Sequence, residues 1–175
     1  MVSHAHEFLI RQEEPGDEAG IARLLEEAFG QPGERLLVDA IRRVRHPAIS
    51  LVGTVGRTIV GHILFTRVSI EPDASGVRAM GLGPMAVLPD RQRQGVGSRL
   101  VAEGLRACAR DECDIVVVVG HPAFYPRFGF ARASTYALRL EFDVPDDAFM
   151  VVGLRPGALA NCGGLVRYLP EFGSV

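Results

Sequence analysis

The residues from Gln92 to Ser98 have the types and spacing of an anion-binding turn. Arg91 and Arg93 lie in a polar loop, and two glycines one residue apart, Gly95 and Gly97, then open a helical pattern. The first turn of a helix presents unpaired N–H groups and the positive end of the helix dipole. Because glycine has no Cβ atom, a phosphate can approach those amides closely. The segment therefore predicts binding of a phosphorylated ligand.

The same segment lacks the signatures of two common nucleotide-binding turns. The GxxxxGK[ST] pattern of a P-loop is absent, and Leu100 stands where the dinucleotide fingerprint has its third small residue. These absences disfavour an α/β protein that binds ATP or NAD, which therefore ranks third among the hypotheses for the function of this chain.

Hydrophobic periodicity places this turn between a strand and a helix of an α/β (α+β) domain. Strands are expected over Phe8–Glu13, Ile49–Val55, Thr58–Ile70, Ala79–Val87, Ile115–Val119, Tyr136–Phe142 and Ala148–Leu154. Helices are expected from Asp17 to Gly30 and from Gly95 to Arg110. A further helix follows the first one and ends before Pro47, with Leu36, Leu37, Ala40, Ile41 and Val44 on its inward side. Gly81, Gly83 and Pro84 predict a bulge or bend in the strand that precedes the turn.

Two motifs in this order resemble the GNAT superfamily of N-acetyltransferases. Gln92-Arg93-Gln94-Gly95-Val96-Gly97 fits its Q/R-x-x-G-x-G/A acyl-CoA signature. Phe124-Tyr125-Pro126-Arg127-Phe128-Gly129-Phe130 is similar to the F-Y-x-x-x-G-F element that follows the fifth strand there. The resemblance covers roughly residues 8–130, and the later tail is similar to a subgroup of predicted bacterial acetyltransferases.

The resemblance implies a mixed, mostly antiparallel central sheet that is flanked by helices. Its fourth and fifth strands are expected to splay apart and admit the cofactor. A single domain over residues 1–175 is expected, with a core of about 8–142 and a C-terminal extension, 143–175, that packs on the same domain.

The resemblance also implies acetyl-CoA as cosubstrate, and it gives the chain's residues their roles. Cofactor binding is expected at Met85, Ala86, Val87, Gln92, Arg93, Gln94, Gly95, Val96, Gly97 and Ser98. The amides of 92–98 would hold the pyrophosphate, and the strand 85–87 would lie against the pantetheine arm and offer an oxyanion-stabilising N–H. Tyr125 would protonate the departing thiolate as the catalytic general acid.

The predicted function is therefore transfer of the acetyl group of acetyl-CoA to a primary amine by direct attack on the thioester. A small-molecule amine is favoured over a protein acceptor. The general base is left open among His121, His62, Glu34, Asp39 and a water molecule. The alternative is a non-catalytic sensor or interaction module that binds CoA or acetyl-CoA on the same fold.

The composition of the chain indicates which classes of binding partner and which cellular compartment it favours. A net charge of −2 gives no overall attraction to nucleic acid or anionic membrane, and 47% hydrophobic residues indicate a globular chain. Three cysteines without CxxC spacing favour neither disulfides nor a metal site, which indicates the cytoplasm. An exposed strand after Phe130 would allow a homodimer.

Overall fold

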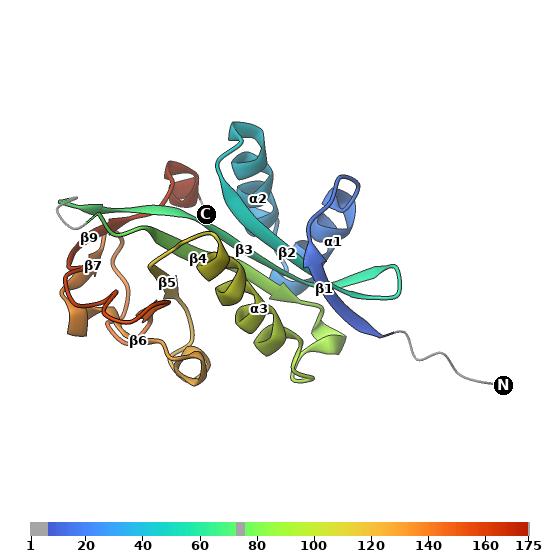
Figure 1. Cartoon of the computed structure of the whole chain (residues 1–175). Coiled ribbons are helices and arrows are strands. Elements are labelled where there is room, and N and C mark those ends of the chain that lie inside the picture. Colours follow the sequence, from blue (N-terminus) through green and yellow to red (C-terminus); the bar gives the residue numbers. More distant parts are fainter. Residues whose placement is uncertain (1–6, 73–75, 175) are drawn as a thin grey trace.

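A twisted sheet runs through the computed structural model, with α1 and α2 on one face and α3 on the other (Figure 1). The model describes residues 7–72 and 76–174. The helices are α1 (Glu18–Phe29), α2 (Gly33–Val44) and α3 (Val96–Arg110). The strands are β1 (Phe8–Gln12), β2 (Ala48–Val55), β3 (Thr58–Glu71), β4 (Ala79–Val87), β5 (Ile115–Val119), β6 (Ala131–Arg132), β7 (Leu138–Leu140), β8 (Phe149–Gly153) and β9 (Gly164–Arg167).

The strand order confirms a mixed and mostly antiparallel sheet. Its main path is β1-β2-β3-β4-β5-β8-β6, and β9 pairs with both β3 and β7. Within that path, only β4 and β5 run parallel, and β7 and β9 form a second parallel pair. The short β6 lies at one edge of the sheet, where the expected contact with a second subunit stays a prediction.

The parallel pair β4–β5 separates before β4 ends, as the resemblance implied. Pairing runs from Ala79 opposite Ile115 to Leu82 opposite Val118 and stops there. On its other side, β4 shifts register against β3 between Leu82 and Met85, so one extra residue is accommodated around Gly83. The predicted bulge is thus present, and it leaves the last residues of β4 with an edge that no strand covers.

The apolar stripe of α1 is buried as predicted, whereas that of α2 differs from the expectation. Leu36 and Val44 were expected inward, but they are 49% and 51% exposed. The buried residues of α2 are instead Leu37, Val38 and Ile41. The reason is tertiary: α2 packs mainly against α1 and the C-terminal 3₁₀ turn Pro170–Ser174, so Val38 enters the core in place of Leu36.

Two strands of the C-terminal part, β7 and β9, differ from the sequence prediction. The strand expected over Tyr136–Phe142 is reduced to β7, because a short 3₁₀ helix (Ala133–Tyr136) precedes it and Ala137 adopts a left-handed φ of 58°. The strand β9 was not predicted. Residues 143–175 were expected as an extension, and their strand β8 lies inside the main sheet between β5 and β6.

A partly buried polar network joins the end of β1 to β2, β3 and α2. His62 is fully buried, and its Nε2 atom lies 2.9 Å from the Ser50 hydroxyl, which donates to Glu13. The Nε atom of Arg42 donates to the same Glu13 carboxylate at 2.8 Å. Burial, together with the charge of Arg42, lowers the pKa of His62 from 6.5 to about 3. His62 is therefore neutral in the folded protein at neutral pH.

This network predicts a loss of stability in mild acid. Below pH 6.5 the unfolded chain protonates His62, whereas the folded chain does so only near pH 3. The unfolding free energy should thus fall toward acid, by up to about 1.4 kcal/mol per pH unit for one proton. Urea unfolding between pH 7 and 4.5 measures this slope, and His62→Gln should reduce it. If His62→Gln does not fold, the wild-type protein still tests the prediction. An NMR titration of its His62 ring with a midpoint near pH 6.5 would contradict it.

The described residues contain neither a candidate membrane span nor a cluster of metal ligands. Across residues 7–72 and 76–174, no helix is long and apolar enough to cross a membrane. No group of three or more His, Cys, Asp or Glu side chains in those ranges is placed to hold a metal ion. The three cysteines are free and buried, and burial raises the pKa of Cys113 to about 11.

Candidate active site

A cleft of about 830 Å³ opens where β4 and β5 separate. It brings together the end of β4, the N-terminus of α3 and the segment that follows β5. Its lining consists of Met85, Val87, Gln92, Arg93, Gly95, Gly97, Ser98, His121, Ala123, Phe124, Tyr125 and Arg127. Both sequence motifs therefore meet in one place, although about thirty residues separate them along the chain.

The N-terminus of α3 forms one wall of the cleft. Arg93 and Gly95 take left-handed φ values of 58° and 83°, and the helix starts at Val96. The first-turn amides of Val96, Gly97 and Ser98 have no intrahelical acceptor. No other backbone group in the described part of the chain pairs with them. They remain available to an anion in the cleft.

Glycine is required at positions 95 and 97 of this wall for different reasons, backbone conformation at Gly95 and space at Gly97. A Cβ atom on Gly97 would lie 3.7 Å from Val87, and 3.8 Å from both Met85 and Phe124, so it would occupy the space between the two walls. A Cβ atom on Gly95 would meet nothing within 4 Å. The requirement at Gly95 is its positive φ, which an L-residue adopts only with strain.

The uncovered edge of β4 forms the floor of the cleft. The Leu88 amide donates to the Val60 carbonyl, on the β3 side. Because successive amides of a strand point to opposite edges, those of Met85 and Val87 point to the open side. The Gln92 side chain donates to the Val87 carbonyl at 3.2 Å and so ties the loop to the strand. An extended ligand can pair with this edge as an additional strand would.

Tyr125 lies in the wall opposite α3 and is held by its packing. Its ring contacts Phe124 and Phe130 edge to face, at centroid distances of 5.0 and 5.5 Å. A Cβ atom on Gly120 would stand 2.3 Å from this ring, so the absence of a side chain there makes room for it. Burial raises the Tyr125 pKa from 10.0 to about 12. The phenol is therefore protonated at neutral pH and able to give up a proton.

Three expected cofactor contacts do not line the cleft with their side chains. Ala86 and Val96 are buried in the core. The Gln94 side chain donates instead to the Asp90 carbonyl at 2.8 Å, within its own loop. These three residues can act in the site only through their backbone.

The candidates for the general base are widely separated. His121 lines the cleft, whereas His62 belongs to the partly buried polar network on the other face. On α2, Asp39 is paired with Arg35 and Arg42, and Glu34 accepts from the Gln31 amide at 3.3 Å. His121 is thus the base candidate that shares a cavity with Tyr125.

Several lining residues were not singled out from the sequence. Ala123, Phe124 and Arg127 lie in or next to the aromatic motif. Gly120, which follows β5, does not line the cleft but makes room for the Tyr125 ring. The Arg127 guanidinium carbon lies 4.8 Å from the centre of the Phe124 ring. The motif predicted which segment lines the site, but it did not predict which side chains of that segment face the ligand. Their directions depend on the orientation of the 3₁₀ turn Tyr125–Phe128.

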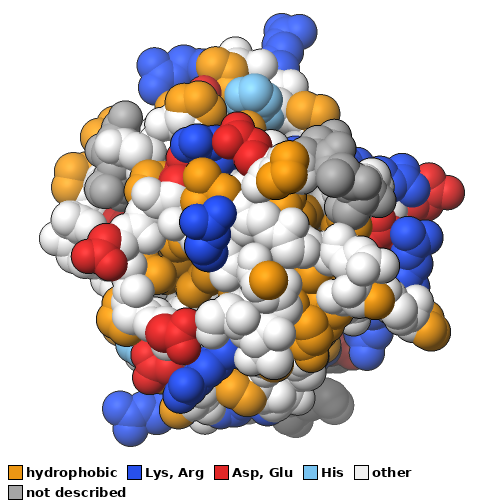
Figure 2. Space-filling model, turned by 90° about the vertical axis from the view of Figure 1, so that its left-hand side faces the viewer, with side chains coloured by type: hydrophobic (Ala, Val, Ile, Leu, Met, Phe, Trp, Pro, Cys, Tyr) orange, Lys and Arg blue, Asp and Glu red, His pale blue; other side chains and the backbone are white. Residues whose placement is uncertain are grey.

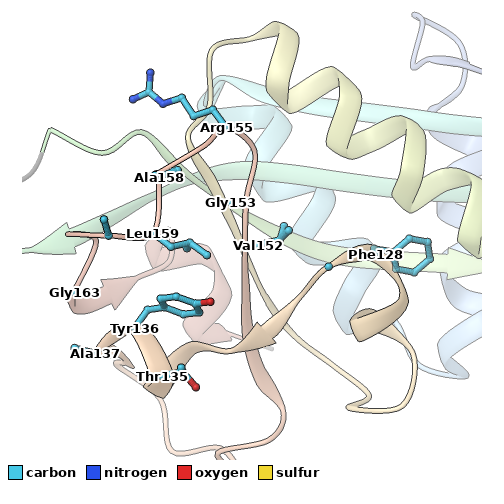
Figure 3. A pocket seen from close by; sticks show the side chains of 13 residues that line it. Phe128, Thr135, Tyr136, Ala137, Val152, Gly153, Arg155, Ala158, Leu159 and Gly163 are labelled. Carbon is cyan, nitrogen blue, oxygen red and sulfur yellow. The ribbon is translucent and has the colours of Figure 1, made fainter.

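A second hollow, of about 810 Å³, lies beside β8 toward the β7 and β9 end of the molecule (Figure 3). Among its lining residues Arg155 alone is charged, and its side chain points out of the hollow. Arg155 also pairs with the buried Asp114 at 2.7 Å. Figure 2, which shows that end of the molecule, has basic and acidic side chains scattered among hydrophobic ones. The cleft at β4 and β5 is therefore the better candidate for chemistry.

The split sheet with a helix N-terminus at its opening is the architecture that the resemblance to N-acetyltransferases implied. A family model described as an acetyltransferase (GNAT) domain matches residues 9–133. YhbS of Escherichia coli strain K12, named an uncharacterized N-acetyltransferase, is 34% identical over 166 residues, which cover 94% of this chain and 98% of YhbS. The chain belongs to the GNAT family of acetyltransferases.

Solved structures agree with this assignment over nearly the whole chain. The crystal structure of E. coli YhbS in complex with CoA has a TM-score of 0.92 at 33% identity and covers 99% of this chain and 96% of that one. A GNAT family acetyltransferase from Brucella melitensis, in complex with acetyl-CoA, has a TM-score of 0.78 at 32% identity and covers 95% and 99%. The fold class and the acyltransferase class expected from the sequence are both confirmed.

Proposed function

We propose that this protein is an acetyl-CoA-dependent N-acetyltransferase that acts on a primary amine. The observation that carries the proposal is the cradle at Gly97: three unpaired helix amides face the uncovered edge of β4 across a gap that a Cβ atom would fill. This shape fits a narrow, extended and anionic ligand. The relatives whose structures contain CoA and acetyl-CoA support the choice of that ligand.

Different residues of the cleft would hold different parts of acetyl-CoA. The α3 amides would bind the pyrophosphate, because unpaired N–H groups and the helix dipole both favour an anion there. The open amides of Met85 and Val87, together with the Met85 carbonyl, would pair with the pantetheine arm. One of these amides would donate to the thioester oxygen as negative charge develops on it.

The reaction then needs few further groups. The amine nitrogen attacks the thioester carbonyl carbon, the carbon–sulfur bond breaks, and the sulfur takes a proton from Tyr125. The amine gives up a proton to His121 or to a water molecule, and the products are an amide and free CoA. The raised pKa of Tyr125 keeps its proton in place until a thiolate leaves.

We favour a small-molecule amine as the acceptor. The amino-acid composition of the chain simplifies the search for this acceptor. All nineteen basic residues are arginines, so the chain has no lysine amine of its own. Acetylation of a lysine in an assay must therefore belong to an added protein. Peptide and small-molecule amines can then be compared without interference from side-chain self-acetylation.

The test of the proposal is calorimetric titration with acetyl-CoA, followed by detection of released CoA thiol with a panel of primary amines. Binding of acetyl-CoA but not of ATP or NAD, together with amine-dependent thiol release, is the expected result. Stoichiometric binding without transfer to any amine would favour the sensor alternative. A folded sample that does not bind acetyl-CoA would overturn both hypotheses.

A further inference from the structure

Arg127 is an uncompensated positive charge in the wall of the cleft. Twelve of the nineteen arginines have a carboxylate at ion-pair distance. Within residues 7–72 and 76–174, Arg93 and Arg127 have none, and both line the cleft. An arginine without an acid partner in a cavity is available to an anionic ligand.

The two arginines stand on different walls. Arg93 lies in the loop that leads into α3, next to the amides that would hold the pyrophosphate. Arg127 comes from the segment after β5 and stacks on the Phe124 ring at 4.8 Å. A Cβ atom on Gly97 would lie 3.8 Å from the Phe124 ring, so this ring faces Gly97 across the cleft. Arg127 therefore stands on the wall formed by the segment after β5, whereas Arg93 stands on the wall formed by the loop before α3.

CoA has a further anionic group besides its pyrophosphate, the phosphate on the 3′-oxygen of its adenosine. The α3 amides and Arg93 are grouped on one wall, where they would hold the pyrophosphate. The 3′-phosphate is a second anionic group on the outer part of the ligand, and a cation on the other wall would complement it. A guanidinium whose face is stacked on an aromatic ring keeps its N–H edge free for two parallel bonds to phosphate oxygens.

We propose that Arg127, held against Phe124, binds the 3′-phosphate of the CoA moiety and makes the protein select acetyl-CoA over its 3′-dephospho form. This inference rests on the proposed function and adds a residue that determines the specificity for the cosubstrate. The stacking has an energetic consequence: an arginine that is already positioned loses less side-chain entropy when the phosphate binds.

The test compares the dissociation constants of acetyl-CoA and acetyl-3′-dephospho-CoA by calorimetry. The wild-type protein should bind acetyl-CoA about 10- to 100-fold more tightly, as expected for hydrogen bonds between charged groups. Arg127→Gln should abolish this preference by weakening acetyl-CoA alone. Arg127→Lys, which keeps the charge but loses the planar fork, should retain only part of the preference.

Two matched variants complete the design. Arg93→Gln should weaken both ligands by a similar factor, so that their ratio stays at the wild-type value. Arg139→Gln removes the same charge from β7, outside the cleft, and should change neither dissociation constant. The inference is overturned if the wild-type protein shows no preference between the two ligands. It is also overturned if Arg127→Gln weakens both ligands equally, as expected if the guanidinium stacked on adenine. Failure of the wild-type protein to bind either ligand would instead overturn the proposed function.

Discussion

The Gly97→Val variant is expected to lose acetyl-CoA binding while it stays folded. The first added carbon sits 3.7 to 3.8 Å from Val87, Met85 and Phe124, which is ordinary contact, and the two Cγ atoms of valine extend into the gap that the ligand must enter. The dissociation constant should rise at least about 100-fold, because several charge-assisted bonds to the α3 amides are lost together. Calorimetric titration measures this change, and Gly97→Ala should give a smaller effect.

Two comparisons separate the steric effect from a general effect on α3. Ala102→Val places the same side chain on the same helix outside the cleft, and it should bind acetyl-CoA as the wild type does. Gly95→Ala should lower the thermal midpoint, since its φ of 83° is strained for alanine by about 1–2 kcal/mol. Wild-type affinity in a folded Gly97→Val protein would show that the cradle is not the phosphate site.

The Tyr125→Phe variant is expected to keep its affinity for acetyl-CoA and lose turnover. Phenylalanine preserves the ring contacts with Phe124 and Phe130 and fits beside Gly120, so the wall of the cleft should keep its shape. What is lost is the proton for the leaving thiolate, and kcat should fall about 100-fold. Thiol release with the best amine of the panel gives kcat and KM separately.

The raised pKa of Tyr125 adds a dependence on pH. Because burial holds the phenol protonated up to about pH 12, wild-type kcat should show no alkaline decline from this group between pH 7 and 10. Tyr136→Phe removes another phenol, outside the cleft, and should retain wild-type kcat. Full kcat in Tyr125→Phe across that pH range would show that another donor protonates the sulfur.

Local sequence patterns were sufficient for the elements whose signals are short-range. The β-branched run Ile115–Val119 became β5 with its predicted bounds, and the glycines and proline of β4 produced the expected bulge. Gly95 and Gly97 opened α3 as expected. The backbone conformation of such glycines, prolines and β-branched runs depends on neighbours within a few residues, so the local sequence determines it.

Other features depend on contacts between distant segments. The orientation of α2 depends on its packing against α1 and the C-terminal 3₁₀ turn. The reduction of β7 and the insertion of β8 between β5 and β6 depend on which strands the assembled sheet offers for pairing. The sequence also could not distinguish the base candidates by location. The structure placed His62 in a partly buried polar network and His121 in the cleft.

By itself, the sequence determined the family of this protein and the loop and tyrosine on which its chemistry is expected to depend. The tertiary structure decided which side chains share the cleft, that Gly97 faces Phe124 across it, and that Arg127 stands unpaired on its far wall. The physical reason is that a motif fixes the course of the backbone over a few residues. The direction of a side chain, its partner and its pKa are set by atoms that lie far away along the chain.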